Sequence, residues 1–281
     1  MPLDMPNLIW SIPELDERAY TLLSKLIYER SGISLGSEKQ AFLRARLSRR
    51  LQSLKLGSFE KYLDYLNNEV EGEHELARMI DVVSTNMTEF FREPAHFEFL
   101  KHSFFTRWKA ANEIRILSAG CATGEEPYSL AICALESLGD AARVSIIGGD
   151  ISGLALTRAK SGIYRLDQLS AISPDRLKRF FLKGVGRNEG LAAVGPRVRS
   201  LVRFQHLNLA EPLKFPSRFH AIFCRNVAIY FDRAGQERLM KKFAAALVPR
   251  GSLFLGHSES MNPSQRLLSY VQPTVYEYCG S

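Results

Sequence analysis

The stretch Leu117–Ile132, "LSAGCATGEEPYSLAI", decides the fold class of this chain of 281 residues. An apolar segment runs into two glycines, Gly120 and Gly124, and then into a helix that starts with Glu125 and Glu126. A glycine turn between a strand and a helix lets a ligand approach the backbone closely. Dinucleotide folds use the spacing G-x-G-x-x-G and place a pyrophosphate at the helix N-terminus. Here the spacing is G-x-x-x-G, and the two carboxylates would repel phosphate and favour a cation.

The segments that follow alternate between strand and helix patterns. Short apolar runs at 113–120, 143–150, 219–226 and 251–257 read as strands, and longer amphipathic segments between them read as helices. This alternation is typical of an α/β fold with a doubly wound, Rossmann-like parallel sheet. It breaks at about residues 163–200, where a Gly-rich, basic stretch indicates a small inserted β-subdomain. The segment "PTVYEY" near the end predicts one more strand.

The first hundred residues have a different pattern, which predicts a bundle of short helices. Leu43, Leu47, Leu51 and Leu54 recur at helical spacing after Ser37, a candidate N-cap. We therefore predict a helical domain over residues 1–100 and an α/β domain over residues 101–281. The start of the chain lacks the basic and apolar regions of a signal peptide, and no apolar run is long enough to span a membrane. The chain is therefore expected to be cytoplasmic.

The carboxyl ends of the predicted strands carry the candidate ligand-binding residues, because open α/β sheets bind ligands at that edge. Going from strand to strand, they are Gly120, Asp150, Asn208, Leu209, Arg225, Asn226 and Tyr230. Asp150 stands where a carboxylate can accept hydrogen bonds from a ribose diol. S-adenosylmethionine fits this set, because it has no phosphate and carries a sulfonium and an ammonium that suit the acidic turn. The alternative is that Glu125 and Glu126 only favour the helix N-terminus.

A second signal precedes the sheet, in "STNMTEFFREPAHFEFL", residues 84–100. Polar Asn86 and Thr88 lead into Phe90, Phe91 and Arg92, and Pro94 opens a helix. The phenylalanines alone are compatible with ordinary core packing. For Arg92 the simpler alternative is an ion pair with one of the flanking glutamates.

Five motifs in this order resemble the chemotaxis receptor methyltransferases, the CheR family: "TNMTEFFRE", "SAGCATGEEPYSLAI", "SGIYR", "FCRNVAIYFD" and "GHSES". Members of that family transfer a methyl group from S-adenosylmethionine to glutamate side chains of chemoreceptors. The resemblance covers nearly the whole chain, including the helical domain and the insertion. It implies that the following residues contact the cofactor: Asn86, Thr88, Arg92, Gly120, Glu126, Asp150, Asn208, Leu209, Arg225 and Asn226.

The predicted acceptor explains why no strong general base is evident in the sequence. A glutamate carboxylate is ionised at neutral pH, so the site has to orient and desolvate it. Arg92 and Tyr230 are the candidate catalytic residues, since a guanidinium and a hydroxyl can both hold a carboxylate. The six histidines show no ligand spacing, and no metal site is expected.

A net charge of +7 indicates a negatively charged partner. Arg46, Arg49 and Arg50 lie beside the leucine stripe of a predicted helix and form a candidate surface for the acidic helical bundle of a receptor. The alternative is a solvated basic face. In the CheR family the insertion of some members also binds a peptide at the receptor C-terminus, and the sequence leaves this open for "KGVGRNEG".

Two other functions remain as alternatives. A nucleic-acid methyltransferase would explain the basic charge, but such enzymes usually carry an Asn/Asp-Pro-Pro-aromatic segment where this chain has "CRNVAIYF". A non-catalytic module that binds a cofactor or nucleotide and signals to partners is the other. We therefore expect a receptor and no nucleic acid as partner.

Overall fold

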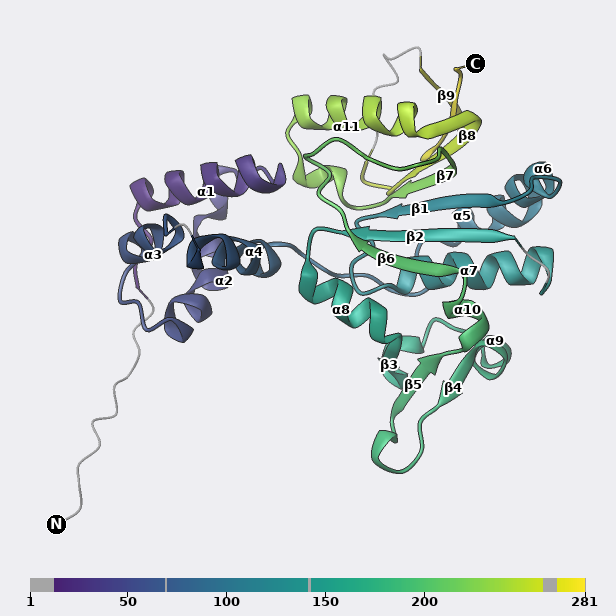
Figure 1. Cartoon of the computed structure of the whole chain (residues 1–281), viewed down its shortest axis with the longest axis horizontal. Coiled ribbons are helices and arrows are strands. Elements are labelled where there is room, and N and C mark those ends of the chain that lie inside the picture. The colour runs from purple at the N-terminus through teal and green to yellow at the C-terminus, as the bar shows by residue number, and fades with distance from the viewer. Residues whose placement is uncertain (1–12, 69, 141–142, 260–266, 281) are drawn as a thin grey trace. The chain divides into compact units, whose positions relative to one another are not determined.

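The computed structural model describes residues 13–68, 70–140, 143–259 and 267–280, and the chain divides after Thr85 into two compact units (Figure 1). The first residues, where no signal peptide is expected, lie outside the described residues. Residues 86–100, which the sequence pattern assigned to the helical domain, belong to the second unit. The reason is packing, because Phe90 contacts the rings of Tyr164 and Phe181 in that unit. None of the described helices is long and apolar enough to cross a bilayer.

The first unit is helical, as predicted. Its described part contains α1 (Glu17–Ser31), the 3-10 turn η1 (Ser37–Lys39), α2 (Gln40–Ser53), α3 (Phe59–Leu66) and α4 (Glu71–Val83). Leu43, Leu47 and Leu51 are fully buried, because helical spacing puts them on one face of α2. Ser37 is not the N-cap that the pattern suggested, since Gly36 occupies that position and η1 begins at Ser37.

The second unit is built on a mixed sheet. Its seven described strands lie in the order β6-β2-β1-β7-β8-β10-β9. Their bounds are β1 (Ile114–Ala119), β2 (Val144–Asp150), β6 (Val202–His206), β7 (Phe219–Cys224), β8 (Leu247–Leu255), β9 (Leu268–Gln272) and β10 (Val275–Tyr278). The neighbours from β6 to β8 are parallel, and β10 is antiparallel to β8 and β9. The carboxyl ends of β6, β2, β1 and β7 therefore lie side by side, and the strand order reverses beside β1.

Helices cover both faces of this sheet. Ile116 and Phe223 belong to one buried cluster with α7, whereas their sequence neighbours Leu117 and Ile222 belong to another with α11. Successive strand side chains point to opposite faces, so a strand with both faces covered is apolar throughout. The helices of this layer system are α5 (Pro94–Phe99), the π-helical turn η2 (Leu100–Phe104), α6 (Phe105–Trp108), α7 (Glu125–Leu138), α8 (Gly153–Ser161) and α11 (Arg233–Ala246). Figure 1 shows α7 and α11 on opposite sides of the central strands. The predicted doubly wound arrangement is confirmed.

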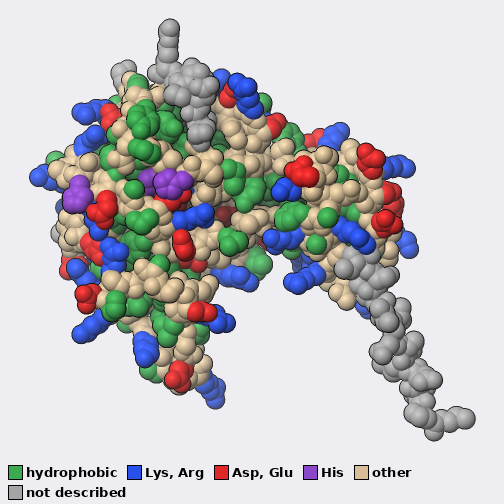
Figure 2. Space-filling model, turned by 180° about the vertical axis from the view of Figure 1, so that it is seen from behind, with side chains coloured by type: hydrophobic (Ala, Val, Ile, Leu, Met, Phe, Trp, Pro, Cys, Tyr) green, Lys and Arg blue, Asp and Glu red, His purple; other side chains and the backbone are tan. Residues whose placement is uncertain are grey.

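The insertion forms a second, smaller sheet with the order β3-β5-β4 in the described residues. Its elements are β3 (Ile163–Arg165), η3 (Leu166–Leu169), α9 (Pro174–Phe180), β4 (Phe181–Lys183), η4 (Gly186–Asn188), β5 (Leu191–Val194) and α10 (Pro196–Arg199). The strand β5 lies between β3 and β4 and is antiparallel to both, so β3 and β4 are the two edge strands. The insertion projects from the main sheet (Figure 1), and Figure 2 shows acidic and basic side chains at its tip.

Candidate functional site

The turn between β1 and α7 has a strained backbone that its glycines make possible. Gly120, Ala122 and Gly124 all have positive φ angles, of 82°, 46° and 97°. A Cβ at Gly120 would overlap the side chain of Val227, and one at Gly124 would lie 2.9 Å from the Cβ of Ala159. The glycines are therefore required by close packing of the protein itself, besides any room they leave for a ligand. The sequence pattern located this turn but did not reveal the packing.

Asp150 ends β2 and binds the glycine turn. Its two carboxylate oxygens accept hydrogen bonds from the backbone N–H groups of Ala122 and Ser152, both at 2.8 Å. The residue is only 6% exposed. A carboxylate oxygen can accept more than one hydrogen bond, so these two bonds are compatible with a ribose hydroxyl as a further donor.

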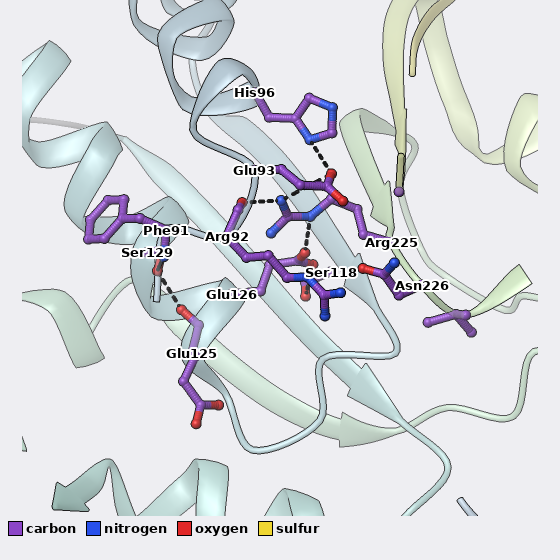
Figure 3. Close-up of polar contacts among 12 residues, drawn as sticks. Phe91, Arg92, Glu93, His96, Ser118, Glu125, Glu126, Ser129, Arg225 and Asn226 are labelled. Atoms are coloured by element: carbon purple, nitrogen blue, oxygen red, sulfur yellow. Dashed lines mark hydrogen bonds and ion pairs between the residues drawn. The ribbon is translucent and has the colours of Figure 1, made fainter. Parts of the chain in front are cut away.

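Glu126 and Arg225 form a buried ion pair beneath this turn (Figure 3). The Arg225 Nε lies 2.6 Å from one Glu126 oxygen, and the Ser118 hydroxyl donates to the other oxygen, also at 2.6 Å. Charge-assisted bonds of this length are the stronger kind. The carboxylate that the sequence suggested for a cationic ligand is thus held by the protein's own cation. Glu125 is also internal: burial raises its pKa, and the Thr123 hydroxyl opposes this by hydrogen bonding.

Arg225 also connects this pair to the loop of Arg92. Its Nη1 donates to the Arg92 carbonyl oxygen and lies 3.7 Å from a Glu93 carboxylate oxygen. His96 is next, with Nδ1 3.3 Å from the same oxygen. Burial, followed by the positive charge of Arg225, lowers the pKa of His96 to about 3, so the ring is neutral.

The loop that carries Arg92 is fixed by its neighbours in the chain. Phe91 and Glu93 have positive φ angles of 55° and 59°. The Phe91 N–H donates to the Ser129 hydroxyl at 2.9 Å. Phe90 is buried, which agrees with the expectation of ordinary core packing. The Arg92 guanidinium reaches the Met87 carbonyl at 3.4 Å. Within the described residues it makes no ion pair with Glu89 or Glu93, so the simpler alternative for Arg92 is not seen.

Two further predicted residues follow β7. Asn226 has a left-handed backbone with φ of 59°, and its side-chain Oδ1 is buried without a hydrogen-bond partner among the described residues. Tyr230 ends the 3-10 turn η5 (Ala228–Tyr230) and is partly exposed. Within the described part of the chain, its hydroxyl makes no hydrogen bond. An orphaned amide oxygen and an available hydroxyl are features of a site built for a ligand.

The remaining predicted residues lie at the margins. Asn208 follows β6 and is engaged in its own turn: Oδ1 accepts from the Ala210 N–H at 3.0 Å, and Nδ2 donates to Glu211 at 3.1 Å. Leu209 is buried. Asn86 and Thr88 are partly buried at the start of the second unit, and their side chains make no hydrogen bond within the described ranges. The individual contacts assigned to all these residues stay predictions.

Of the three arginines predicted to bind a partner, one does not fit a docking face. Arg46 and Arg49 are exposed on α2. Arg50 instead donates from Nε and Nη2 to the two carboxylate oxygens of Glu75, at 2.9 and 2.5 Å, and Glu75 is 1% exposed. Helical spacing put Arg50 near the basic face, but it could not show that α4 supplies a buried carboxylate.

The sequence reasoning missed Glu93, His96, Ser118 and Glu259. Glu259 lies in the motif "GHSES", which contributed to the family resemblance, but no role was assigned to it. It is a buried acid that contacts the turn after β7. For Glu259, the only sequence signal was a carboxylate in a Gly- and Ser-rich turn after a strand. The contacts of Glu93, His96, Ser118 and Glu259 have no characteristic spacing in the sequence.

The strand order, the glycine turn after β1 and the acid that ends β2 are features of a Rossmann-like nucleoside-binding domain. Residues 86–276 match the family model described as CheR methyltransferase, SAM binding domain. Residues 18–84 match CheR methyltransferase, all-alpha domain. The boundary between the two matches coincides with the boundary between the two compact units.

Curated relatives agree with the family match. The chemotaxis protein methyltransferase of Salmonella typhimurium is 40% identical over 264 residues, which cover 93% of this chain and 90% of that protein. The Escherichia coli protein of the same name is 39% identical, with 98% and 97% covered. Chemotaxis protein methyltransferase 2 of Pseudomonas aeruginosa is 39% identical, with 98% and 99% covered.

The chain belongs to the CheR methyltransferase family. It is an S-adenosylmethionine-dependent methyltransferase, and the predicted family, fold class and cofactor are confirmed. The site's chemistry fits this cofactor. The end of β2 presents a carboxylate, the buried Asn226 Oδ1 lacks a partner among the described residues, and α7 opens with two glutamates, which disfavour a pyrophosphate at its N-terminus.

Proposed function

We propose that this methyltransferase acts on glutamate side-chain carboxylates of chemoreceptors and forms glutamyl methyl esters in chemotaxis adaptation. The observation that carries the proposal is the state of Arg92. Although Glu89 and Glu93 flank it in sequence, its guanidinium makes no ion pair within the described residues and contacts only a carbonyl oxygen. A cation left available at the edge of the cofactor site is suited to receive a carboxylate acceptor.

The acceptor accounts for the composition of the site. A glutamate carboxylate is ionised at neutral pH and is already a nucleophile, so the protein has to orient it and exclude water. Arg92 would hold one carboxylate oxygen through a charged hydrogen bond. Tyr230, whose hydroxyl is available, would hold the acceptor by a neutral one. Both residues are predicted to orient the acceptor rather than to remove a proton.

The cofactor-binding residues follow from the strand ends. S-adenosylmethionine supplies a methyl group on a positively charged sulfur. Asp150 would accept hydrogen bonds from the ribose hydroxyls. Asn226 would accept a hydrogen bond from the cofactor with its amide oxygen, which has no partner in the described structure. Glu126 and Arg225 would contact the cofactor as an ion pair, because each already holds the side chain of the other in place. Gly120, Asn86, Thr88, Asn208 and Leu209 complete the proposed pocket.

The cytoplasmic helical bundle of a receptor is the proposed partner. Arg46 and Arg49 project from α2 and would meet its acidic surface. The inserted sheet offers a second contact, for a peptide at the receptor C-terminus. Its edge strand β4 is followed by exposed Val185 and contains Leu182, which is 58% exposed. An extended peptide can pair with such an edge and place side chains against these apolar groups.

The test is methyl transfer to receptor-bearing membranes from a radiolabelled methyl donor. We expect receptor-associated label that is released as methanol by mild base, which is the behaviour of a methyl ester. Receptors in which the accepting glutamates are replaced by alanine are the matched control and should stay unlabelled. Receptors lacking their C-terminal peptide test the second contact. Base-stable label, or label found in added RNA or DNA instead of receptor, would contradict the proposal.

A further inference from the structure

We infer that Glu259 is a positioning residue that sets the geometry of the turn carrying Asn226 and Tyr230. Glu259 is 5% exposed. Its Oε1 accepts from the N–H groups of Val227 at 2.8 Å and Ile229 at 3.3 Å. Its Oε2 accepts from those of Asn226 at 2.8 Å and Gly256 at 2.7 Å.

These four donors come from the loops that follow two neighbouring strands. Three of them belong to the turn after β7, and Gly256 comes directly after β8. Converging backbone N–H groups form a concave anion-binding nest, and here the protein fills the nest with its own carboxylate. Glu259 therefore ties the carboxyl end of β7 to that of β8. The turn cannot shift relative to the sheet without breaking these bonds.

The turn needs such support because its backbone is unusual. Asn226 has a left-handed conformation, and the 3-10 turn that follows ends at Tyr230. The Tyr230 N–H donates to the Val227 carbonyl at 3.1 Å, so the position of Tyr230 depends on a residue that Glu259 holds directly. Glu259 itself has no place in the proposed chemistry. Its effect on methyl transfer passes through Asn226 and Tyr230.

The bonding pattern requires a carboxylate. Each Glu259 oxygen accepts two N–H groups, so both oxygens must be acceptors. In Glu259→Gln the amide NH2 would face two N–H donors, which leaves them unsatisfied and repels them. Glu259→Ala removes the Cγ atom and the carboxylate group, which together have the heavy atoms of an acetate ion, and it leaves the nest empty. Acetate or formate should therefore restore the turn in Glu259→Ala but not in Glu259→Gln, where the amide still fills the space.

The experiment compares Glu259→Gln and Glu259→Ala with wild type in three measurements: amide hydrogen exchange at residues 226–230, affinity for S-adenosylhomocysteine, and single-turnover receptor methylation. Asp232→Ala is the matched control, since it removes a carboxylate that accepts from the Gly235 N–H at the start of α11 but leaves the four N–H groups bound by Glu259 with their acceptor. We expect both Glu259 variants to exchange faster in the turn and to methylate about 10- to 100-fold more slowly, as the loss of one aligned hydrogen bond would do. Acetate, but not chloride at equal ionic strength, should recover part of the rate in Glu259→Ala only.

The methylation arm rests on the proposed function, and the exchange arm does not. If wild type fails to methylate receptor, the proposed acceptor is wrong, whereas slow exchange in wild type and fast exchange in the variants still supports the role of Glu259. A Glu259→Gln protein with wild-type exchange in the turn overturns the inference. So does a variant that melts at lower temperature yet keeps the wild-type single-turnover rate per folded molecule, because that result assigns Glu259 to stability alone.

Discussion

Each unit of the chain contains a buried ion pair between a glutamate and an arginine, Glu75–Arg50 and Glu126–Arg225, and the two pairs differ in what surrounds them. In the helical unit, Glu75 receives both Arg50 hydrogen bonds and a third from the Tyr62 hydroxyl at 2.9 Å. In the second unit, Arg225 divides its bonds between Glu126 and the Arg92 carbonyl. The bonds around Glu75 all join helices of the first unit to one another. The bonds of Arg225 join two strand ends to the loop of Arg92, a predicted catalytic residue. A buried ion pair therefore stabilises helix packing in one unit and supports the candidate site in the other.

Arg225→Met should have the largest effect, because it removes the cation that two buried carboxylates share. Glu126 would be left without its ion pair, and breaking a buried pair in this way costs about 3–5 kcal/mol of unfolding free energy. The Arg92 loop would also lose its anchor, so affinity for S-adenosylhomocysteine should fall. Denaturant titration and calorimetry measure the two effects, with Arg225→Lys as an intermediate control. Unchanged affinity in the folded variant would show that the pair does not support the site.

Arg50→Met should cost about 3 kcal/mol in the helical unit, because Glu75 is 1% exposed and would lose its nearest counterion, keeping only Arg78 at 3.9 Å among the described residues. Affinity for S-adenosylhomocysteine should stay at the wild-type value, in contrast to Arg225→Met. Hydrogen exchange in α2 and α4 reports the loss of stability locally, which is necessary because a chain of two units need not unfold in one step. Arg49→Met, an exposed neighbour, is the control and should change little. If both variants behave alike, the distinction between the two pairs fails.

The sequence predicted more of the fold than of these buried ion pairs and hydrogen bonds. Periodicity located the helical unit, the strands and the insertion, because each depends on residues close together in the chain. It also placed Glu126 and Arg225 at the same edge of the sheet. It could not show that they bind each other, since they are 99 positions apart and ion pairs leave no periodic signature. For the same reason helical spacing places Arg50 on a docking face, and the motif "GHSES" alone indicates no role for Glu259.

Tyr230→Phe separates alignment from binding within the site. Loss of the hydroxyl should lower the single-turnover rate about 10- to 100-fold, which corresponds to one hydrogen bond of about 1.4–2.7 kcal/mol made mainly in the transition state. Cofactor affinity should change much less, because Tyr230 is predicted to contact the acceptor. The alternative is that the ring only packs beside Phe231. In that case the variant would melt at lower temperature and keep its rate per folded molecule.

His96→Gln tests the electrostatics beside Arg225. Burial and the Arg225 charge lower the pKa of His96 to about 3 in the folded protein. The unfolded chain, with a pKa of about 6.5, therefore binds a proton that the folded protein does not, and stability is lost as the pH falls below about 6.5, by up to ~1.4 kcal/mol per pH unit. Wild type should lose more unfolding free energy than His96→Gln between about pH 7 and pH 5. The exposed His102→Gln is the control, and identical slopes for all three proteins would show that neither burial nor the Arg225 charge lowers the pKa of His96.

The smallest effect is expected on the surface, at Arg46 and Arg49. Both are exposed, and exposed charges act mainly on encounter with a partner, so Arg46→Glu with Arg49→Glu should leave stability and cofactor affinity unchanged. Receptor methylation at low salt should fall several-fold, and the difference from wild type should shrink as salt screens the charges. Arg18→Glu with Lys25→Glu makes the same change in net charge on exposed positions of α1, and it should have less effect. If both double variants lose the same rate, overall charge governs encounter and α2 is only a solvated basic face. If neither loses rate at low salt, docking lies elsewhere, and the edge of the inserted sheet becomes the contact to test next.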